Sequence, residues 1–263
     1  MFSNPEWQVP THEEKEFSSR RNPYAIVIPV INEGERIQAQ LREMASLGIM
    51  SGFDVVIADG GSTDGSLDDD FLHEMDITAL LTKTGAGHLS SQLRMAYAWC
   101  LDKGYDGIIT IDGNGKDSVA SIPQFGKALD DGIDYVQASR FIKGGKAINT
   151  PLIRTMAIRL LHAPLTSLSA RHWLTDTTQG FRAYSKRYLL DDRVKPFRSC
   201  FMDYELLAYL AVRATQLGYT ATEVPTTRSY PGTGKIPTKI SPVRGSAGLL
   251  KVLFKACLGG YNP

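Results

Sequence analysis

Three short segments of the chain combine acidic or amide side chains with glycines. They are residues 32–35 (Asn-Glu-Gly-Glu), 59–65 (Asp-Gly-Gly-Ser-Thr-Asp-Gly) and 112–117 (Asp-Gly-Asn-Gly-Lys-Asp). Carboxylate and amide oxygens are the ligands that Mg²⁺ and Mn²⁺ prefer, so Asp112 and Asn114 could hold such an ion. The Asp59 carboxylate could accept hydrogen bonds from a ribose or a base. These groups together suit a nucleoside diphosphate, whose charge the ion would neutralise.

An alternative interpretation is that these segments are ordinary turns. Asp-Gly and Asn-Gly are common turn dipeptides, so either of the two longer segments alone would favour a turn. Each segment, however, directly follows a short apolar run, and these runs are residues 24–30, 53–58 and 107–111. Such runs are typical of strands buried on both faces of a parallel sheet. Polar Gly-rich loops after successive strands therefore favour a binding site.

The elements that must position these loops follow the same pattern. We expect further strands at residues 77–81 and 133–138, with helices near residues 37–47 and 88–101. Strands alternating with helices predict an α/β fold with a mostly parallel central sheet flanked by helices. In such sheets ligands bind beyond the carboxyl ends of the strands. The three loops are therefore expected to meet at one edge.

Beyond about residue 145 the strict alternation is lost. Helical stretches near residues 151–168 and 201–217 surround a polar segment at 175–182, and we expect this more helical half to shape the acceptor side. We divide the chain into an N-terminal extension (1–22), a catalytic domain (23–240) and a C-terminal amphipathic helix (241–263).

Composition limits the function classes. The 263 residues carry 29 Lys and Arg against 28 Asp and Glu, a balance that offers no broad surface for nucleic acid. The three cysteines show neither a disulfide framework nor zinc-site spacing. Residues 1–21 lack the apolar core typical of a secretory leader, and no apolar run reaches about 18 residues. We therefore expect a cytoplasmic protein whose membrane contact, if any, is peripheral at the cytoplasmic face, and which could be a homo-oligomer.

Specific motifs resemble a known family. Residues 28–33 (Ile-Pro-Val-Ile-Asn-Glu) and 58–66 (Ala-Asp-Gly-Gly-Ser-Thr-Asp-Gly-Ser) are similar to the first-strand and second-strand signatures of family 2 glycosyltransferases, which have the A-type fold. Residues 139–145, 176–182 and 223–225, with Glu205, resemble later motifs of dolichyl- and undecaprenyl-phosphate sugar transferases. The resemblance covers roughly residues 24–240.

This resemblance implies an inverting enzyme that moves a sugar from a GDP- or UDP-sugar to a polyprenyl phosphate, with Mg²⁺ or Mn²⁺ as cofactor. Residue types and resemblance together predict the following site residues: for catalysis Asp112, Asp176 and Arg140; for the donor Pro29, Ile31, Glu33, Asp59, Gly113, Asn114, Arg140 and Arg154; for the acceptor Arg182, Glu205, Arg228 and Lys235; and for the metal Asp112, Asn114 and Asp117.

The metal loop departs from the family pattern, which is Asp-x-Asp. Here Asn114 replaces the second aspartate, and a neutral amide oxygen is a weaker ligand for Mg²⁺ than a carboxylate. Metal dependence is therefore in question. Asp117 could either complete the ligand set or cap the next helix, and Lys116 could partly replace the ion by touching phosphate directly.

Two alternatives to lipid-phosphate transfer stay open. Asp176 could act as general base if the acceptor were a hydroxyl of a glycan or small molecule, whereas an anionic phosphate acceptor needs no base. The altered metal loop could instead indicate a protein that only binds nucleotide sugars. The spacing of the histidines suits no metal site, and we interpret His162 and His172 as structural or surface residues.

The C-terminal residues 243–258 form an apolar run in which Arg244, Lys251 and Lys255 share one helical face. Such a helix suits a membrane surface. The other interpretation is that it packs on its own domain.

Overall fold

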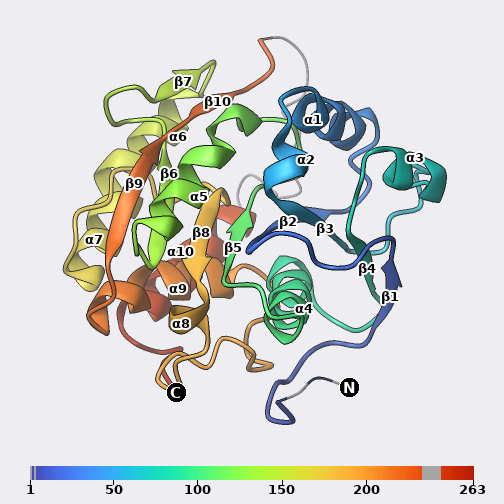
Figure 1. The fold of residues 1–263 in the computed structure, drawn as a ribbon. Helices are drawn as coiled ribbons and strands as arrows, with labels where there is room; N and C mark the ends of the chain where they lie inside the picture. The colour runs from blue at the N-terminus through green and yellow to red at the C-terminus, as the bar shows by residue number, and fades with distance from the viewer. Residues whose placement is uncertain (1, 3, 233–243) are drawn as a thin grey trace.

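A computed structural model describes residue 2, residues 4–232 and residues 244–263 (Figure 1). Its strands are β1 (His12–Glu16), β2 (Tyr24–Val30), β3 (Asp54–Asp59), β4 (Ala79–Lys83), β5 (Gly107–Thr110), β6 (Tyr135–Ser139), β7 (Lys146–Ile148), β8 (Arg182–Ser185), β9 (Ala221–Pro225) and β10 (Thr227–Ser229). Its helices are α1 (Glu35–Ser46), α2 (Ile49–Gly52), α3 (Asp69–Glu74), α4 (Leu89–Asp102), α5 (Ile122–Asp130), α6 (Leu152–Ala157), α7 (Ala163–Ala170), α8 (Lys186–Leu189), α9 (Glu205–Gln216) and α10 (Arg244–Cys257), with a 3-10 turn η1 (Val119–Ser121) and a π-helical turn η2 (Ile158–His162).

Eight of the described strands form one central sheet in the order β1-β4-β3-β2-β5-β8-β6-β9. The neighbours β4, β3, β2 and β5 are parallel, as are β6 and β9. The five predicted strands are confirmed as β2 to β6. Two antiparallel strands were not foreseen. β8 lies between β5 and β6, and β1 pairs with β4 at the edge of the sheet.

The sheet is buried on both faces by side chains that alternate along each strand. In β2, Ala25 and Val27 point into a core shared with α4 and α9, while Ile26 and Ile28 point into the opposite core with α1 and α5. Figure 1 shows α1 and α4 on opposite sides of these strands. Because every second residue must be apolar for each face, the whole strand reads as one continuous apolar run.

The second half of the chain adds a layer beside the sheet. β7 and β10 form a separate two-stranded parallel ribbon, and α6, η2 and α7 follow one another without a break. β7 and β10 lie side by side with α6 near them, whereas α7 runs down towards α9 and α10 (Figure 1).

The C-terminal helix α10 packs on its own domain. Leu253 and Ala256 are buried where α10 meets α9 and α7, and the Ser169 hydroxyl donates to the Cys257 carbonyl at 2.8 Å. Phe254 and Leu258 remain exposed. Much of the apolar face that predicted membrane contact is therefore used for packing. None of the helices within the described ranges has the length and apolar character needed to span a bilayer.

The division of the chain at residues 22 and 240 remains a prediction. Residues 12–16, from the segment designated an extension, form the sheet edge, where His12 pairs with Lys83 and Glu16 with Ala79.

His162 gives a testable link between packing and pH. Burial, helped by the nearby Arg182 cation, lowers the pKa of the His162 imidazole to about 4, from an ordinary value of 6.5. The folded state therefore favours the neutral ring. The free energy of unfolding is highest above about pH 6.5 and decreases as the pH falls towards 4, because the unfolded state then takes up a proton that the folded state does not. We expect His162→Gln to remove a pH-dependent change of roughly 3 kcal/mol in the free energy of unfolding. Urea titrations at several pH values would contradict this if both proteins lost stability equally between these limits.

Candidate active site

The three polar loops meet at the carboxyl ends of β2, β3 and β5, as expected. The backbone N–H of Gly60 donates to the Val30 carbonyl at 2.8 Å, and that of Gly113 to the Pro29 carbonyl at 3.4 Å. A Cβ on Gly113 would lie 2.9 Å from the Val30 side chain, so this glycine is required by close approach of the two chains. Gly113 is thus needed where the first and third loops meet.

Asp59 orders the loop in which it lies. Its carboxylate is buried and accepts from the backbone N–H of Ser62 at 3.0 Å and from the Ser62 hydroxyl at 2.6 Å. The Ser62 hydroxyl oxygen also accepts from the Asn32 N–H at 2.9 Å, and the Asn32 side chain accepts from Thr63. Asp59 therefore links the first two loops, and its predicted contact with a nucleoside remains a prediction.

The outer part of the first loop borders a shallow hollow of about 410 Å³. Glu33 accepts from the Arg36 guanidinium at 2.7 Å in this hollow, and Asp64 accepts from the Gly34 N–H at 2.8 Å. Ile31 is exposed beside it. Of the predicted donor residues, Pro29, Ile31, Glu33, Asp59 and Gly113 are therefore gathered at one edge of the sheet.

The third loop is fastened to β10 by backbone hydrogen bonds. The Ser118 N–H donates to the Thr227 carbonyl at 2.9 Å, and the Ser229 N–H donates to the Lys116 carbonyl at 2.8 Å. This pairing sets Asp117 directly opposite Arg228. The segment after Asp112 and the strand β10 thus form one unit, although they are far apart in the sequence.

Arg228 is the cation at the centre of this unit. Its guanidinium donates to the Asp117 carboxylate and lies 3.6 Å from the Asp112 carboxylate. The Arg228 side chain is 8% exposed and that of Asp117 is fully buried. Burial disfavours the Arg228 cation, but Asp117 and Asp112 outweigh this effect and raise its pKa. A buried carboxylate of this kind needs a counter-charge, and Arg228 supplies it.

Three cations converge on the ring of Tyr230, and we call Lys116, Arg154 and Arg228 the basic cluster. Lys116 Nζ and Arg154 Cζ each lie 5.6 Å from the ring centroid, and Arg228 Cζ lies 5.8 Å from it. Arg154 also donates to the Tyr230 hydroxyl at 2.8 Å. Burial alone would raise the pKa of Tyr230, but the Arg228 and Arg154 cations outweigh burial and lower it. The basic cluster therefore favours negative charge at this position.

Arg140 and Asp176 form a separate buried pair. Arg140 Nε donates to Asp176 Oδ2 at 2.6 Å and Nη2 to Oδ1 at 3.1 Å, with 1% and 0% of the side chains exposed. Glu223 supports the pair by accepting from the Asp176 N–H at 3.1 Å. Within the described part of the chain, Arg140 Nη1 is buried and has no hydrogen-bond partner. Asp176 thus neutralises Arg140 in the interior, and its predicted catalytic role remains a prediction.

No family model matches the chain, but several characterised proteins are similar to it in sequence. The chain is 29% identical over 212 residues to the undecaprenyl-phosphate mannosyltransferase of Micrococcus luteus, covering 76% of this chain and 81% of that protein. It is 24% identical over 205 residues to the polyprenol monophosphomannose synthase of Mycolicibacterium smegmatis, covering 77% and 76%. A dolichyl-phosphate hexose transferase of Haloferax volcanii is 31% identical over 152 residues, or 57% of this chain and 61% of that protein.

The fold has close counterparts among solved structures. Glucosyl-3-phosphoglycerate synthase from Mycobacterium tuberculosis, in complex with Mn²⁺, UDP-glucose and phosphoglyceric acid, superposes with a TM-score of 0.63 at 15% identity. The match covers 89% of this chain and 79% of that one. The chain is a glycosyltransferase with the A-type fold. The resemblance to polyprenyl-phosphate sugar transferases that the motifs predicted is confirmed by the relatives.

Several predicted acceptor residues of the transferase are engaged elsewhere. Arg182 is buried, and its guanidinium donates to the carbonyls of Gln179 and Thr177 at 2.9 Å each and to that of Leu207. Glu205 accepts from the backbone N–H groups of two residues just before α9, Met202 and Asp203. Arg182 therefore does not join the basic cluster. Lys235 lies outside the described residues.

One tyrosine of the site was missed by the sequence reasoning. Tyr230 directly follows β10 and lies two residues after Arg228. Because side chains two residues apart along an extended chain point to the same side, this spacing is the signal that could have placed Tyr230 beside Arg228.

The predicted metal ligands do not fit a divalent cation in this arrangement. The Asn114 amide Nδ2 points to Asp112 Oδ2 at 3.4 Å, and Asn114 Oδ1 accepts from the Lys116 N–H at 3.2 Å. Asp117 neither joins Asp112 at an open site nor caps η1, whose N-cap is Ser118, because the buried carboxylate pairs with Arg228. Among the described residues, no group of three or more His, Cys, Asp or Glu side chains could hold a metal ion.

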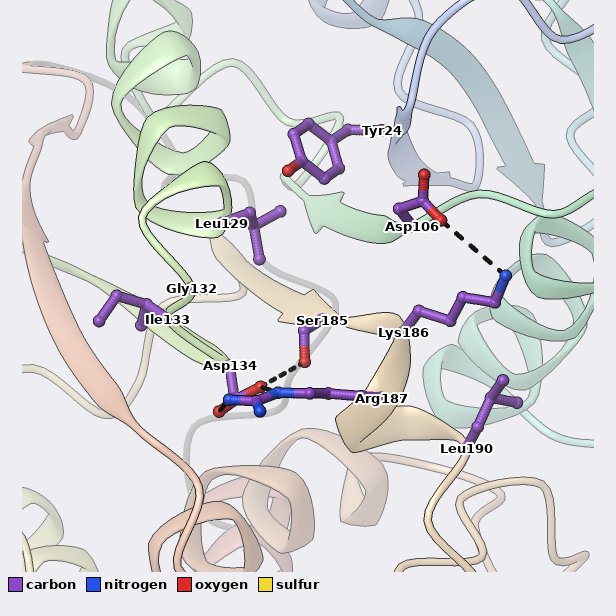
Figure 2. Close-up of a pocket in the computed structure, with 10 residues that line it drawn as sticks. All are labelled: Tyr24, Asp106, Leu129, Gly132, Ile133, Asp134, Ser185, Lys186, Arg187 and Leu190. Atoms are coloured by element: carbon purple, nitrogen blue, oxygen red, sulfur yellow. Dashed lines mark hydrogen bonds and ion pairs between the residues drawn. The ribbon is translucent and has the colours of Figure 1, made fainter.

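A second groove of about 550 Å³ lies at the opposite end of the sheet (Figure 2). Its charged side chains are paired with one another, since Asp134 accepts from Arg187 at 2.5 Å and from Ser185 at 2.7 Å, and Lys186 lies 3.9 Å from Asp106. These pairs join the residues just before β5 and β6 to β8 and α8, so we assign the groove a structural role.

Proposed function

We propose that the transferase moves a hexose, with inversion at the anomeric carbon, from a GDP- or UDP-sugar to a polyprenyl phosphate at the cytoplasmic face of a membrane. The observation that supports this most strongly is the basic cluster beside the third loop, since a site for two phosphate-containing substrates needs concentrated positive charge. The relatives named above transfer mannose or another hexose to lipid phosphates, so these are the first substrates to test.

The state of Asp176 favours a phosphate acceptor over a hydroxyl acceptor. A general base must reach the proton that it removes, whereas Asp176 is fully buried and bound by Arg140. A lipid phosphate is already anionic near neutral pH and can attack without a base. The Arg140–Asp176 pair then has a structural role in the interior of the protein.

An exposed apolar surface supports the membrane part of the proposal. The run α6–η2–α7 begins two residues before Arg154, and several of its large apolar side chains are exposed: Leu152, Ile153, Met156, Leu160, Leu161 and Leu168, followed by Trp173. Several large apolar side chains exposed along one helical run favour a contact with a membrane or a partner. Because Arg154 comes from the same helix, a lipid seated on this surface would bring its phosphate to the basic cluster.

The decisive experiment is a product assay. The full chain is incubated with radiolabelled GDP-mannose or with UDP-hexoses, together with polyprenyl phosphate in detergent, and label is followed into the organic phase. We expect a glycosyl phospholipid from one donor class. Label that appears only on an added glycan or small-molecule hydroxyl would overturn the acceptor assignment. Nucleotide-sugar binding without any transfer would favour a protein that only binds these ligands.

The membrane surface can be tested separately with the double variant Ile153→Ser/Leu160→Ser. Each fully inserted Leu or Ile contributes roughly 1.5–3 kcal/mol, so we expect binding to liposomes that contain polyprenyl phosphate to fall at least about tenfold. Nucleotide affinity should not change. Leu47→Ser is the matched control, since Leu47 is exposed at the end of α1. Equal liposome binding by the double variant and the control would assign the surface to a partner protein instead.

A further inference from the structure

We propose that this transferase neutralises the leaving nucleoside diphosphate with the side chains of Lys116 and Arg228 in place of a divalent cation. The inference rests on the proposed sugar transfer, but not on the identity of the acceptor. It concerns the charges that surround the third loop, where the family pattern has a second carboxylate and this chain has Asn114.

The balance of charge at the loop favours an anion over a cation. Asp112 and Asp117 supply two negative charges, and the basic cluster supplies three positive ones. A divalent ion would add two further positive charges next to a guanidinium that already lies 3.6 Å from Asp112. Without any metal ion, these five side chains leave one net positive charge, which attracts a diphosphate.

The cations are held by the fold and do not have to be recruited. Lys116 is buried, and its carbonyl is fixed by the N–H of Ser229. Arg228 is held by Asp117 from one side and by the Tyr230 ring from the other. Fixed charges of this kind stabilise developing charge without reorganisation, which is the usual contribution of a bound metal ion.

The chemical step balances without a further reactant. The bond between the anomeric carbon and the β-phosphate oxygen breaks, and its electron pair leaves with that oxygen. A bond from an acceptor oxygen to the anomeric carbon forms on the opposite face. The leaving diphosphate gains one negative charge, which the Lys116 ammonium and the Arg228 guanidinium stabilise through charge-assisted hydrogen bonds. Nothing is oxidised or reduced.

Calorimetry of GDP and UDP binding, in excess EDTA and in Mg²⁺ or Mn²⁺, tests the proposal alongside turnover. We expect the Kd of the preferred nucleotide to differ by less than about twofold between the two conditions. Lys116→Met should weaken its binding at least about tenfold in both, because a desolvated charged contact is lost, and Lys116→Arg should restore most of it. Lys127→Met, at an exposed site on α5, is the matched control.

A second variant should make nucleotide binding dependent on a divalent metal ion. The double variant Asn114→Asp/Lys116→Ala restores a second carboxylate and removes a cation, so EDTA should now weaken nucleotide binding at least about tenfold. The proposal is overturned if EDTA weakens nucleotide binding by the wild-type chain at least about tenfold while Lys116→Met leaves that binding unchanged. Metal-independent nucleotide binding without sugar transfer would contradict the proposed function but keep the charge assignment. A chain that binds no nucleotide under any condition contradicts both.

Discussion

Replacing Asp176 with alanine is expected to destabilise the folded transferase by about 3–5 kcal/mol, because it leaves the Arg140 guanidinium buried without its counter-charge. Both side chains are essentially inaccessible to water, and the pair is bidentate, with bonds of 2.6 and 3.1 Å. Gln179 and Thr178 also hydrogen-bond to the two charged side chains and carry no charge, so neither can replace Asp176 as the counter-charge. Urea unfolding of the wild type and the variant at neutral pH would measure the loss.

Two further variants separate charge from shape. Asp176→Asn keeps the volume and one acceptor oxygen, so its loss should be smaller than that of Asp176→Ala. Arg140→Met combined with Asp176→Ala removes both charges and should recover a large part of the stability. A different outcome would reverse the assignment. If Asp176→Ala folded with nearly wild-type stability but lost all transfer, Asp176 would be the general base of a hydroxyl-acceptor enzyme.

The central strands could be predicted because a strand buried on both faces consists of consecutive apolar residues. β2 is apolar throughout and β3 is apolar between its terminal residues Asp54 and Asp59, since both faces of the sheet are covered. The strand β1 (His-Glu-Glu-Lys-Glu) has no apolar pattern, because it is a mostly exposed edge strand that buries little apolar surface. The strand β8 is four residues long and begins with Arg182, so neither its length nor its first residue suggested a buried strand.

The same contrast holds at the site. The loops after β2, β3 and β5 could be placed together because parallel strands bring their carboxyl ends to one edge. The pairing of Asp117 with Arg228 spans 111 residues and depends on the backbone ladder between residues 116–118 and β10. The sequence also does not reveal which groups an arginine side chain contacts in the fold. Arg154 and Arg182 read alike in the sequence, yet Arg154 faces Tyr230 while Arg182 is bound by carbonyls of the core.

Gly180 offers a way to displace Asp112 without changing it. A Cβ added to Gly180 would lie 3.1 Å from Asp112 Cγ and closer still to Oδ1, so the aspartate side chain would have to move. The Asp112 side chain is 22% exposed and can rotate towards solvent, which makes the movement inexpensive for folding. It would, however, separate the carboxylate from Arg228.

We therefore expect Gly180→Ala to lower kcat/KM by about 10²-fold, since a displacement of about 1 Å in a catalytic arrangement has effects of this size. The free energy of unfolding should change by less than about 1.5 kcal/mol. Gly52→Ala is the matched control, because a Cβ there meets open space at the end of α2. Asp112→Ala should have at least the effect of Gly180→Ala, and the double variant should be little worse than Asp112→Ala alone, because both changes act through the same carboxylate. Wild-type turnover by a folded Gly180→Ala protein would show that the position of Asp112 does not matter for transfer, and would remove this residue from the catalytic site.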